Sequence, residues 1–181
     1  SETAADVTVL TSEDLDSTAA LTLDDKLRQI PGFQLFRRSG SRVANPTSQG
    51  VSVRGVGASG ASRALVLDDG IPLNDPFGGW IYWDRVPQEA VSGVEVVRGA
   101  ASDLYGTNAM GGVINLIPHR PTASTLDFEA SYGNQTTPDA SLSASLRFDR
   151  WIAIADAEAF HTDGYFIVPQ HLRGRVDSPS N

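Results

Sequence analysis

The glycine-rich segment 55–60 has the spacing of a loop that cradles a phosphate group. It reads G-x-G-x-x-G after a short apolar stretch, and Asp75 follows at the distance of the acidic residue that binds a ribose. That motif must open a helix, because the helix N-terminus holds the pyrophosphate. Residues 64–67 instead read as a strand, which leaves no room for such a helix. We therefore interpret the glycines as a flexible connection between strands.

The other patterns that could carry catalysis or bind a metal are incomplete. Segment 106–111 has both glycines of a P-loop but lacks the lysine and hydroxyl residue that must follow. Segment 68–70, Asp-Asp-Gly, is more typical of a turn than of a cation site. No G-x-S-x-G elbow is present, and each histidine stands alone, without a partner at ligand spacing: His119, His161 and His171. We expect no catalytic residue, no metal site and no cofactor.

Two arginines occupy equivalent places in the sequence. Arg54 and Arg98 each end an apolar strand, and a glycine follows each of them. An arginine that leaves a buried strand needs a carboxylate partner, because an unpaired buried charge is very costly. The alternative is a pair of solvated strand ends, and the residues alone leave both interpretations open.

An aromatic loop offers the best candidate surface for binding. Segment 74–83 combines two of the three tryptophans with two adjacent glycines, and exposed aromatic side chains on an adaptable loop suit ligand contact. Packing against neighbouring protein would explain the same residues equally well. The candidate contacts in this loop are Asn74, Asp75, Phe77, Trp80, Tyr82 and Trp83.

Composition excludes several kinds of partner. The 181 residues suffice for one domain with some remainder, and 22 acidic residues against 14 basic ones give a net charge of −8. This balance disfavours nucleic acid and an anionic membrane surface, which require basic patches. Cysteine is absent, so disulfides and thiolate metal sites are excluded. No apolar run reaches the length of a spanning helix, although short alternating barrel strands would escape a hydropathy scan.

The elements that must position these residues are short. Leucine and isoleucine recur at helical spacing after Thr22, which is followed by an acid three residues on, and Pro31-Gly32 stops the helix. Thr11 begins a similar capping pattern, and a single helical turn is expected at 87–90. The mixture favours an α+β layer. Strands are expected at 7–10, 33–36, 51–54, 64–67, 94–98 and 112–117.

The pattern of apolar and polar residues in the sequence changes after Arg120. Residues 126–132 and 142–148 alternate apolar with polar side chains across a turn, and 151–160 is a less regular third candidate strand. Outer-membrane barrel strands have this pattern, but so does an antiparallel sheet of a soluble domain. We therefore expect two domains, 1–120 and 121–181.

Several segments, in order, closely resemble the plug domain of TonB-dependent outer-membrane receptors. The resemblance extends over residues 6–118, and its order makes it far more specific than any single motif. It also favours barrel strands over a soluble sheet for residues 121–181. The matching segments are 6–15, 23–32, 51–55, 65–73, 94–99 and 104–115.

The resemblance implies a fold and a function. Residues 1–120 would be an α+β plug domain with a small mixed sheet and short helices. The first two or three antiparallel strands of a 22-stranded transmembrane β-barrel would follow. Such receptors import ferric siderophores, cobalamin, haem or glycans across the outer membrane of Gram-negative bacteria. The expected partners are a TonB-type energy-coupling protein, the remainder of the barrel, outer-membrane lipid and small-molecule cargo.

The resemblance also implies roles for particular residues. Arg54 and Arg98 match the plug arginines that pair with barrel glutamates, and segments 39–46 and 74–83 match the apical loops that face cargo. The first of these loops adds Arg42 and Asn45 to the candidate contacts. Neither a TonB box nor most barrel strands are visible, so we expect the chain to be a fragment, a truncated product or one part of a larger assembly.

Two other functions remain as alternatives. The same plug fold could serve as a ligand-sensing or adhesion module without import, which an upstream signalling domain would support. A soluble α+β enzyme is the third possibility, and segment 55–60 is its only support.

Overall fold

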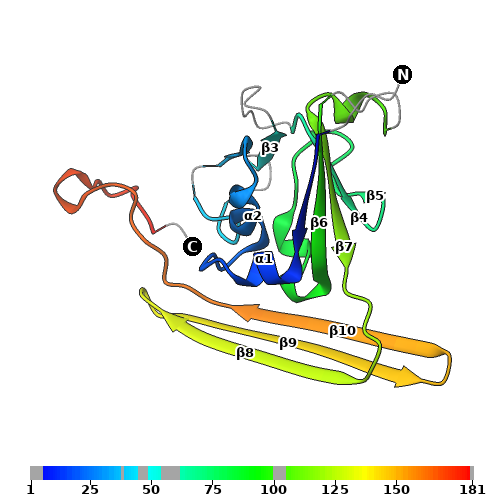
Figure 1. Cartoon of the computed structure of the whole chain (residues 1–181). Coiled ribbons are helices and arrows are strands. Elements are labelled where there is room, and N and C mark those ends of the chain that lie inside the picture. The colour runs from blue at the N-terminus through cyan, green and yellow to red at the C-terminus, as the bar shows by residue number, and fades with distance from the viewer. Residues whose placement is uncertain (1–5, 38, 45–48, 54–61, 100–104, 180–181) are drawn as a thin grey trace. The chain divides into compact units, whose positions relative to one another are not determined.

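The computed structural model describes residues 6–37, 39–44, 49–53, 62–99 and 105–179. The chain divides into two compact units, Ser1–Arg120 and Pro121–Asn181. The first contains a five-stranded mixed sheet and a two-stranded sheet, and the second contains a three-stranded antiparallel sheet (Figure 1). Within these described ranges, no helix is both long and apolar enough to cross a membrane.

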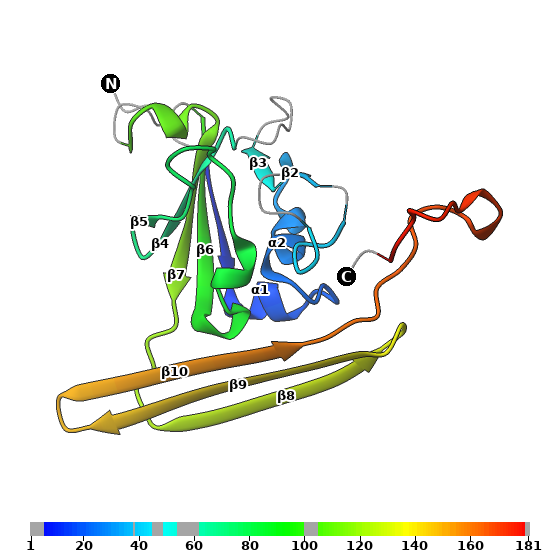
Figure 2. The ribbon, with the colours of Figure 1, turned by 180° about the vertical axis from the view of Figure 1, so that it is seen from behind.

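The five-stranded sheet has the order β1-β6-β7-β4-β5. Its central strands are β6 (Val91–Arg98) and β7 (Gly112–Pro118), which run antiparallel. The strand β4 (Leu65–Asp68) lies parallel to β7 and turns back into the short β5 (Ile71–Pro72) at one edge (Figure 2). The strand β1 (Asp6–Thr11) forms the other edge, paired with β6. The sheet is therefore mixed, as the resemblance implies.

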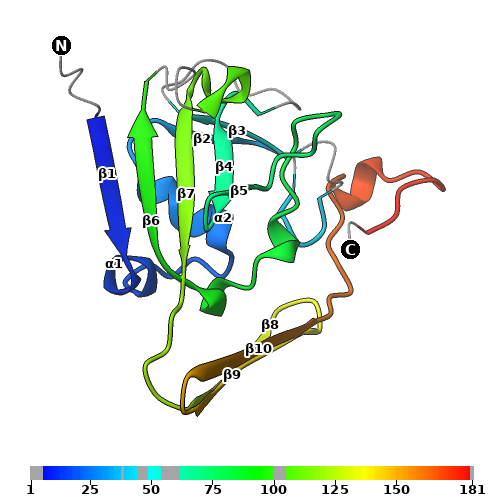
Figure 3. The same ribbon diagram turned by 90° about the vertical axis from the view of Figure 1, so that its right-hand side faces the viewer.

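The main core covers one face of this sheet. Side chains alternate across a strand, so the even-numbered residues of β4, β6 and β7 point to the same side. The helical segment and the two-stranded sheet lie behind that face in Figure 3. A smaller cluster on the opposite face contains Leu65, Leu67, Ala109 and Val113. The main core includes Val66, Val94, Val96, Ile114 and Leu116 of the sheet and Leu15, Leu23, Leu27 and Ile30 of the helical segment.

The helices begin where the capping patterns predict them. The helix α1 (Ser12–Asp16) has a complete capping box between Thr11 and Asp14. The helix α2 (Leu23–Lys26) follows Thr22 and continues as a 3-10 turn, η1 (Leu27–Gln29). The Thr22 hydroxyl donates to the Asp25 carboxylate at 3.2 Å, and its side chain does not cap the backbone. The second predicted box is therefore wrong, although its helix start is right.

The strands β2 (Phe33–Phe36) and β3 (Gly50–Val53) pair antiparallel as a separate ribbon. Both strands are predicted from the sequence, but their pairing with each other is not. Val51 and Val53 are fully buried against the main core. The ribbon therefore fixes the ends of the long segment that joins its strands.

The second unit is an antiparallel meander of β8 (Thr125–Gly133), β9 (Thr137–Phe148) and β10 (Trp151–Phe160). All three predicted strands are present, and β8 and β9 confirm the alternation in the sequence. The third strand stays irregular in the structure, because Ile152 and Ile154 pair with Arg147 and Ser145 on the polar face. The other face of β10 presents Trp151 and a row of alanines.

Candidate functional site

The aromatic loop is a closed turn whose shape is fixed by its own hydrogen bonds. Asn74 and Ile81 form a bridge at its base. The Asp75 N–H donates to the Trp80 carbonyl at 2.9 Å, and the Gly79 N–H donates to the Asp75 carbonyl at 2.8 Å. The Asp75 carboxylate accepts two more backbone N–H groups, from Phe77 at 2.9 Å and Gly78 at 2.7 Å. This Asx turn holds the tip in one conformation.

The aromatic residues of this loop differ sharply in exposure. The Phe77 side chain is 96% exposed, whereas Trp83 is 3% exposed and belongs to the main core. Trp80 is half-buried and folds against Gly78, where an added Cβ would lie 1.5 Å from its ring. Tyr82 is half-buried too, and the Arg85 guanidinium lies 4.2 Å from its ring centre. Phe77 is therefore the aromatic side chain that this loop presents to its surroundings.

Asn74 holds the loop to the sheet. Its side-chain oxygen accepts the Val66 N–H at 2.7 Å, and its amide nitrogen donates to the Ala64 carbonyl at 3.1 Å. The residue is 9% exposed. Because these bonds occupy the amide, Asn74 and Trp83 form the framework of the loop, while Asp75 fixes its turn.

The first predicted loop begins with a tight turn. The Gly40 carbonyl accepts the Val43 N–H at 3.1 Å and the Ala44 N–H at 2.8 Å. Arg42 lies within this turn and is half-buried. Asn45, the other candidate contact of this loop, lies outside the described residues.

A buried ionic cluster anchors this turn to α2. Asp24 is fully buried and pairs with Arg37, whose side chain is 6% exposed. Arg37 also pairs with Asp25, and the Ser41 hydroxyl donates to Asp24 at 2.7 Å. The sequence predicts Asp24 only as part of a capping pattern.

Arg98 binds the edge strand of its own sheet. Its guanidinium donates to the Asp6 carboxylate at 2.8 Å and to the Thr8 hydroxyl at 2.6 Å. The Arg98 side chain is 17% exposed, and its Nε is buried without a hydrogen-bond partner among the described residues. Arg54, the second predicted docking arginine, lies outside the described residues, as does segment 55–60.

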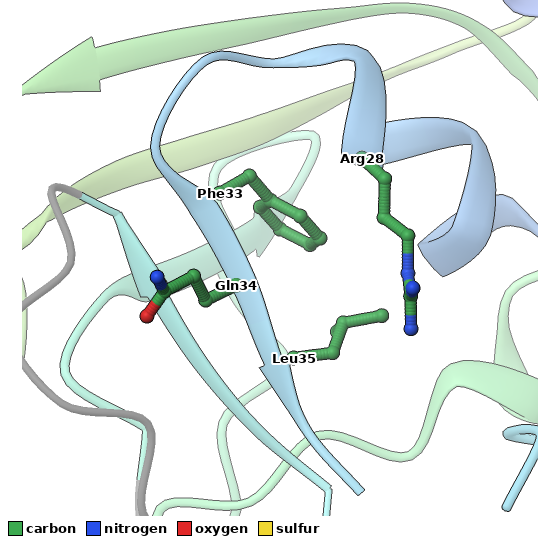
Figure 4. A pocket seen from close by; sticks show the side chains of 4 residues that line it. All are labelled: Arg28, Phe33, Gln34 and Leu35. Atoms are coloured by element: carbon green, nitrogen blue, oxygen red, sulfur yellow. The ribbon is translucent and has the colours of Figure 1, made fainter.

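A groove lies beside β2 and is lined by residues of η1 and β2. Its volume is about 360 Å³, and Figure 4 shows Arg28 extending from η1 alongside Phe33 and Leu35, with Gln34 on the same strand. The side chains described as lining the groove are one cation, one amide and two apolar groups. Throughout the described part of the chain, no group of three or more His, Cys, Asp or Glu side chains is placed to hold a metal ion.

The sequence of residues 1–113 matches the family described as TonB-dependent Receptor Plug Domain. The vitamin B12 transporter BtuB of Vibrio cholerae serotype O1 is 36% identical over 118 residues. That match covers 65% of this chain and 18% of the transporter. The chain therefore spans about a fifth of the length of this relative.

Solved structures of receptors share the fold. The pyoverdine outer membrane receptor FpvA from Pseudomonas aeruginosa PAO1 has a TM-score of 0.68 at 23% identity, over 90% of this chain and 23% of that receptor. The siderophore receptor PirA from Acinetobacter baumannii has a TM-score of 0.64 at 25% identity, over 87% of this chain and 25% of that receptor. These likenesses show the fold, and the family match over more than half of the chain shows that the chain belongs to the TonB-dependent receptor plug family.

Proposed function

We propose that the chain is the plug and first barrel strands of an outer-membrane importer for a scarce nutrient, driven by a TonB-type coupling protein. One observation carries this proposal: a plug fold continues in the same chain into long antiparallel strands with an exposed apolar face. A plug alone would suit any ligand-recognition role. A plug joined to membrane-type strands suits a gated pore.

The apolar face of β8, β9 and β10 supports a position against lipid. Leu126 and Phe128 are 72% and 70% exposed, and Leu146 on the neighbouring strand is 52% exposed. Contiguous apolar surface of this kind marks an interaction site. Tyr132 lies near one end of this face, and Phe148 pairs with Trp151 at the other. Aromatic residues at both ends of an apolar band are typical of transmembrane barrel strands.

The opposite face of these strands is mostly polar, although it includes Ile152 and Ile154, and its acidic part suits a watery lumen. The register places Asp127 and Asp156 on either side of Ser143, and Glu129 and Glu158 on either side of Ser141. Barrel strands alternate between apolar outward and polar inward residues. We propose that this polar face points into the barrel.

Cargo would contact the loops at the end of the plug that carries Arg42 and Phe77. Phe77 supports this role because a rigid turn exposes an aromatic ring, which can bind an apolar surface with little loss of conformational entropy. The proposed contacts are Arg42, Asn45, Asp75, Phe77, Trp80 and Tyr82, with Asn74 and Trp83 acting through the loop framework. The relatives' names, a vitamin B12 transporter and a siderophore receptor, support a cargo of this kind.

Arg54 and Arg98 would dock the plug against its barrel. Arg98 supports this role because its side chain is 17% exposed, so part of it remains accessible to a barrel carboxylate. In cells that make the full-length parent, we expect an alanine at either position to loosen the plug and to lower its resistance to protease. Wild-type protease resistance and uptake in both variants would rule out the docking role.

Energy-dependent uptake tests the proposed function. Cells that make the full-length parent are supplied with labelled vitamin B12 or a ferric siderophore, with and without the gene for the coupling protein. We expect uptake of one cargo class, and we expect it to stop when the coupling protein is deleted. Equal uptake in both strains would contradict the energy-coupled mechanism.

A sensing or adhesion module on the same fold is the alternative. The relatives' names favour import, since the curated relative reported above is a transporter. Cargo binding at the cell surface without any accumulation inside the cell would favour the alternative.

A further inference from the structure

Gln49 is a buried polar residue that none of the proposed roles explains. It directly precedes β3 and is 1% exposed. Its amide nitrogen donates to the Ser41 carbonyl at 3.2 Å and to the Ala44 carbonyl at 3.1 Å. The side chain therefore binds the first loop through two backbone carbonyls of its tight turn.

The backbone of the same residue binds the second loop. The Gln49 carbonyl accepts the Ile81 N–H at 3.0 Å, and Ile81 closes the base of the aromatic loop with Asn74. One residue thus makes hydrogen bonds to both loops that we propose to face cargo. It is fixed in turn by β3, whose Val51 and Val53 are buried in the main core.

Packing alone does not account for a glutamine at this place. A buried amide must satisfy its polar atoms, and the Gln49 Oε1 has no hydrogen-bond partner among the described residues. An apolar side chain of the same length would fill the space without that cost. The two donor bonds to the turn are what a glutamine adds, because no apolar side chain can hold two carbonyls.

Three other polar side chains near the two loops hold different parts of the structure. The Ser41 hydroxyl binds Asp24 and so ties the turn to α2, on the side of the helical segment. The Asn74 amide and the Asp75 carboxylate act within the second loop and on β4. Gln49 differs from these residues because its side chain binds the first loop while its own backbone carbonyl binds the second.

We propose that Gln49 is a positioning residue that holds the first loop, at Ser41–Ala44, in a fixed place relative to the aromatic loop at Asn74–Ile81. A site formed by two loops binds a bulky ligand tightly only when both loops are pre-organised. The effect of Gln49 on cargo binding therefore rests on the proposed function. The structural part of the proposal is independent of cargo.

Spin labels can measure the distance between the loops directly. The sequence contains no cysteine, so Val43→Cys and Phe77→Cys in the detergent-solubilised chain accept labels at those two places only. Gln49→Met removes both donors at nearly constant size, and Gln49→Glu removes them while keeping the shape. Gln34→Met is the matched control, because Gln34 is exposed on the adjacent strand. Near-ultraviolet circular dichroism from the buried Trp83 checks that each variant keeps its core.

We expect one narrow distance distribution in the wild type and in Gln34→Met, and a broadened distribution in both Gln49 variants. In the full-length parent without labels, we expect each Gln49 variant to bind cargo about tenfold more weakly. An unchanged distribution in folded Gln49→Met or Gln49→Glu overturns the proposal, whatever cargo binding does. A broadened distribution with unchanged cargo binding supports the role of Gln49 and counts against these loops as the cargo site.

Discussion

Arg37 and Asp24 show how much one buried charge pair can contribute in this fold. Both side chains are almost completely buried. Removing one member leaves the other as an uncompensated charge, so we expect Arg37→Ala to lower the free energy of unfolding by about 3–5 kcal/mol. Urea unfolding measures the change.

An exposed pair on the same helical segment is the matched control. Arg28 pairs with Asp25 at 2.9 Å, but its side chain is 57% exposed. Exposed pairs contribute about 1 kcal/mol or less, so Arg28→Ala should lower the free energy of unfolding far less. Equal losses in Arg28→Ala and Arg37→Ala would show that Asp24 is not the cause.

Asp14 makes the first helix sensitive to acid. The Thr11 backbone N–H and then the Thr11 hydroxyl hydrogen-bond its carboxylate and hold the pKa of Asp14 below its ordinary value of 3.8. Because the pKa of Asp14 is lower in the folded chain than in the unfolded chain, its carboxylate stabilises the fold at any pH above the unfolded pKa. This stabilisation is lost as the pH falls through the pKa of the folded chain. We expect Asp14→Asn to flatten the decline of the unfolding midpoint below about pH 4. If the unfolding midpoint of Asp14→Asn declines as steeply as that of the wild type, other carboxylates cause the acid sensitivity.

At the scale of elements, the start of β7 depends on glycine. Gly112 has φ +135°, and an added Cβ would lie 2.6 Å from the Val97 carbonyl oxygen. We expect Gly112→Ala to destabilise the fold by more than about 1 kcal/mol, because the conformation and the contact both oppose a side chain. Gly40→Ala should be nearly neutral, since nothing lies within 4 Å of its added Cβ. Thermal unfolding of the two variants measures the difference.

The edge strand β1 depends on Arg98. This strand pairs on one side with β6, and Arg98 adds bonds to Asp6 and Thr8. We expect Arg98→Met to lower the local opening free energy of the β1 amides by about 1–2 kcal/mol, a modest value because Asp6 is largely exposed. Hydrogen exchange measures it. Arg120→Met, which removes an exposed pair with Asp69, should leave β1 unchanged.

Local patterns predict the elements better than their partners. The Thr11 capping box, the break at Pro31-Gly32 and the alternation after Arg120 depend on neighbours in the sequence, and the structure agrees with each. The β2–β3 pairing and the parallel β4–β7 pairing join residues far apart in the sequence, so no local sequence pattern predicts them.

For the whole molecule, the site was predicted as a region and not as a geometry. The sequence locates the aromatic loop but treats Phe77 and Trp83 alike, although one is exposed and the other lies in the core. Gln49 and the pair of Asp24 with Arg37 escaped prediction, because their partners are set by tertiary contacts. Glutamine before a strand and aspartate in a first helical turn are both ordinary on the surface.

The two faces of the second unit provide a test of the whole assembly. Leu142 lies on the exposed apolar face beside Phe128, whereas Ser143 lies on the opposite face between Asp127 and Asp156. In the full-length parent, we expect Leu142→Arg to cost about 2–4 kcal/mol if that face meets the middle of a bilayer. Ser143→Arg should be tolerated, because its charge meets two carboxylates in a watery lumen.

The amount of protease-resistant receptor in isolated outer membranes measures both variants, with total protein as the reference. A face that meets lipid predicts a large loss for Leu142→Arg and little for Ser143→Arg. A face that packs against another protein would also reject an arginine. Extraction into detergent therefore has to distinguish a lipid-facing surface from a protein interface. In one outcome, neither larger detergent micelles nor added lipid restores the folded Leu142→Arg receptor, and a partner protein no longer co-purifies with it. The strands then belong to a protein interface instead of a barrel wall.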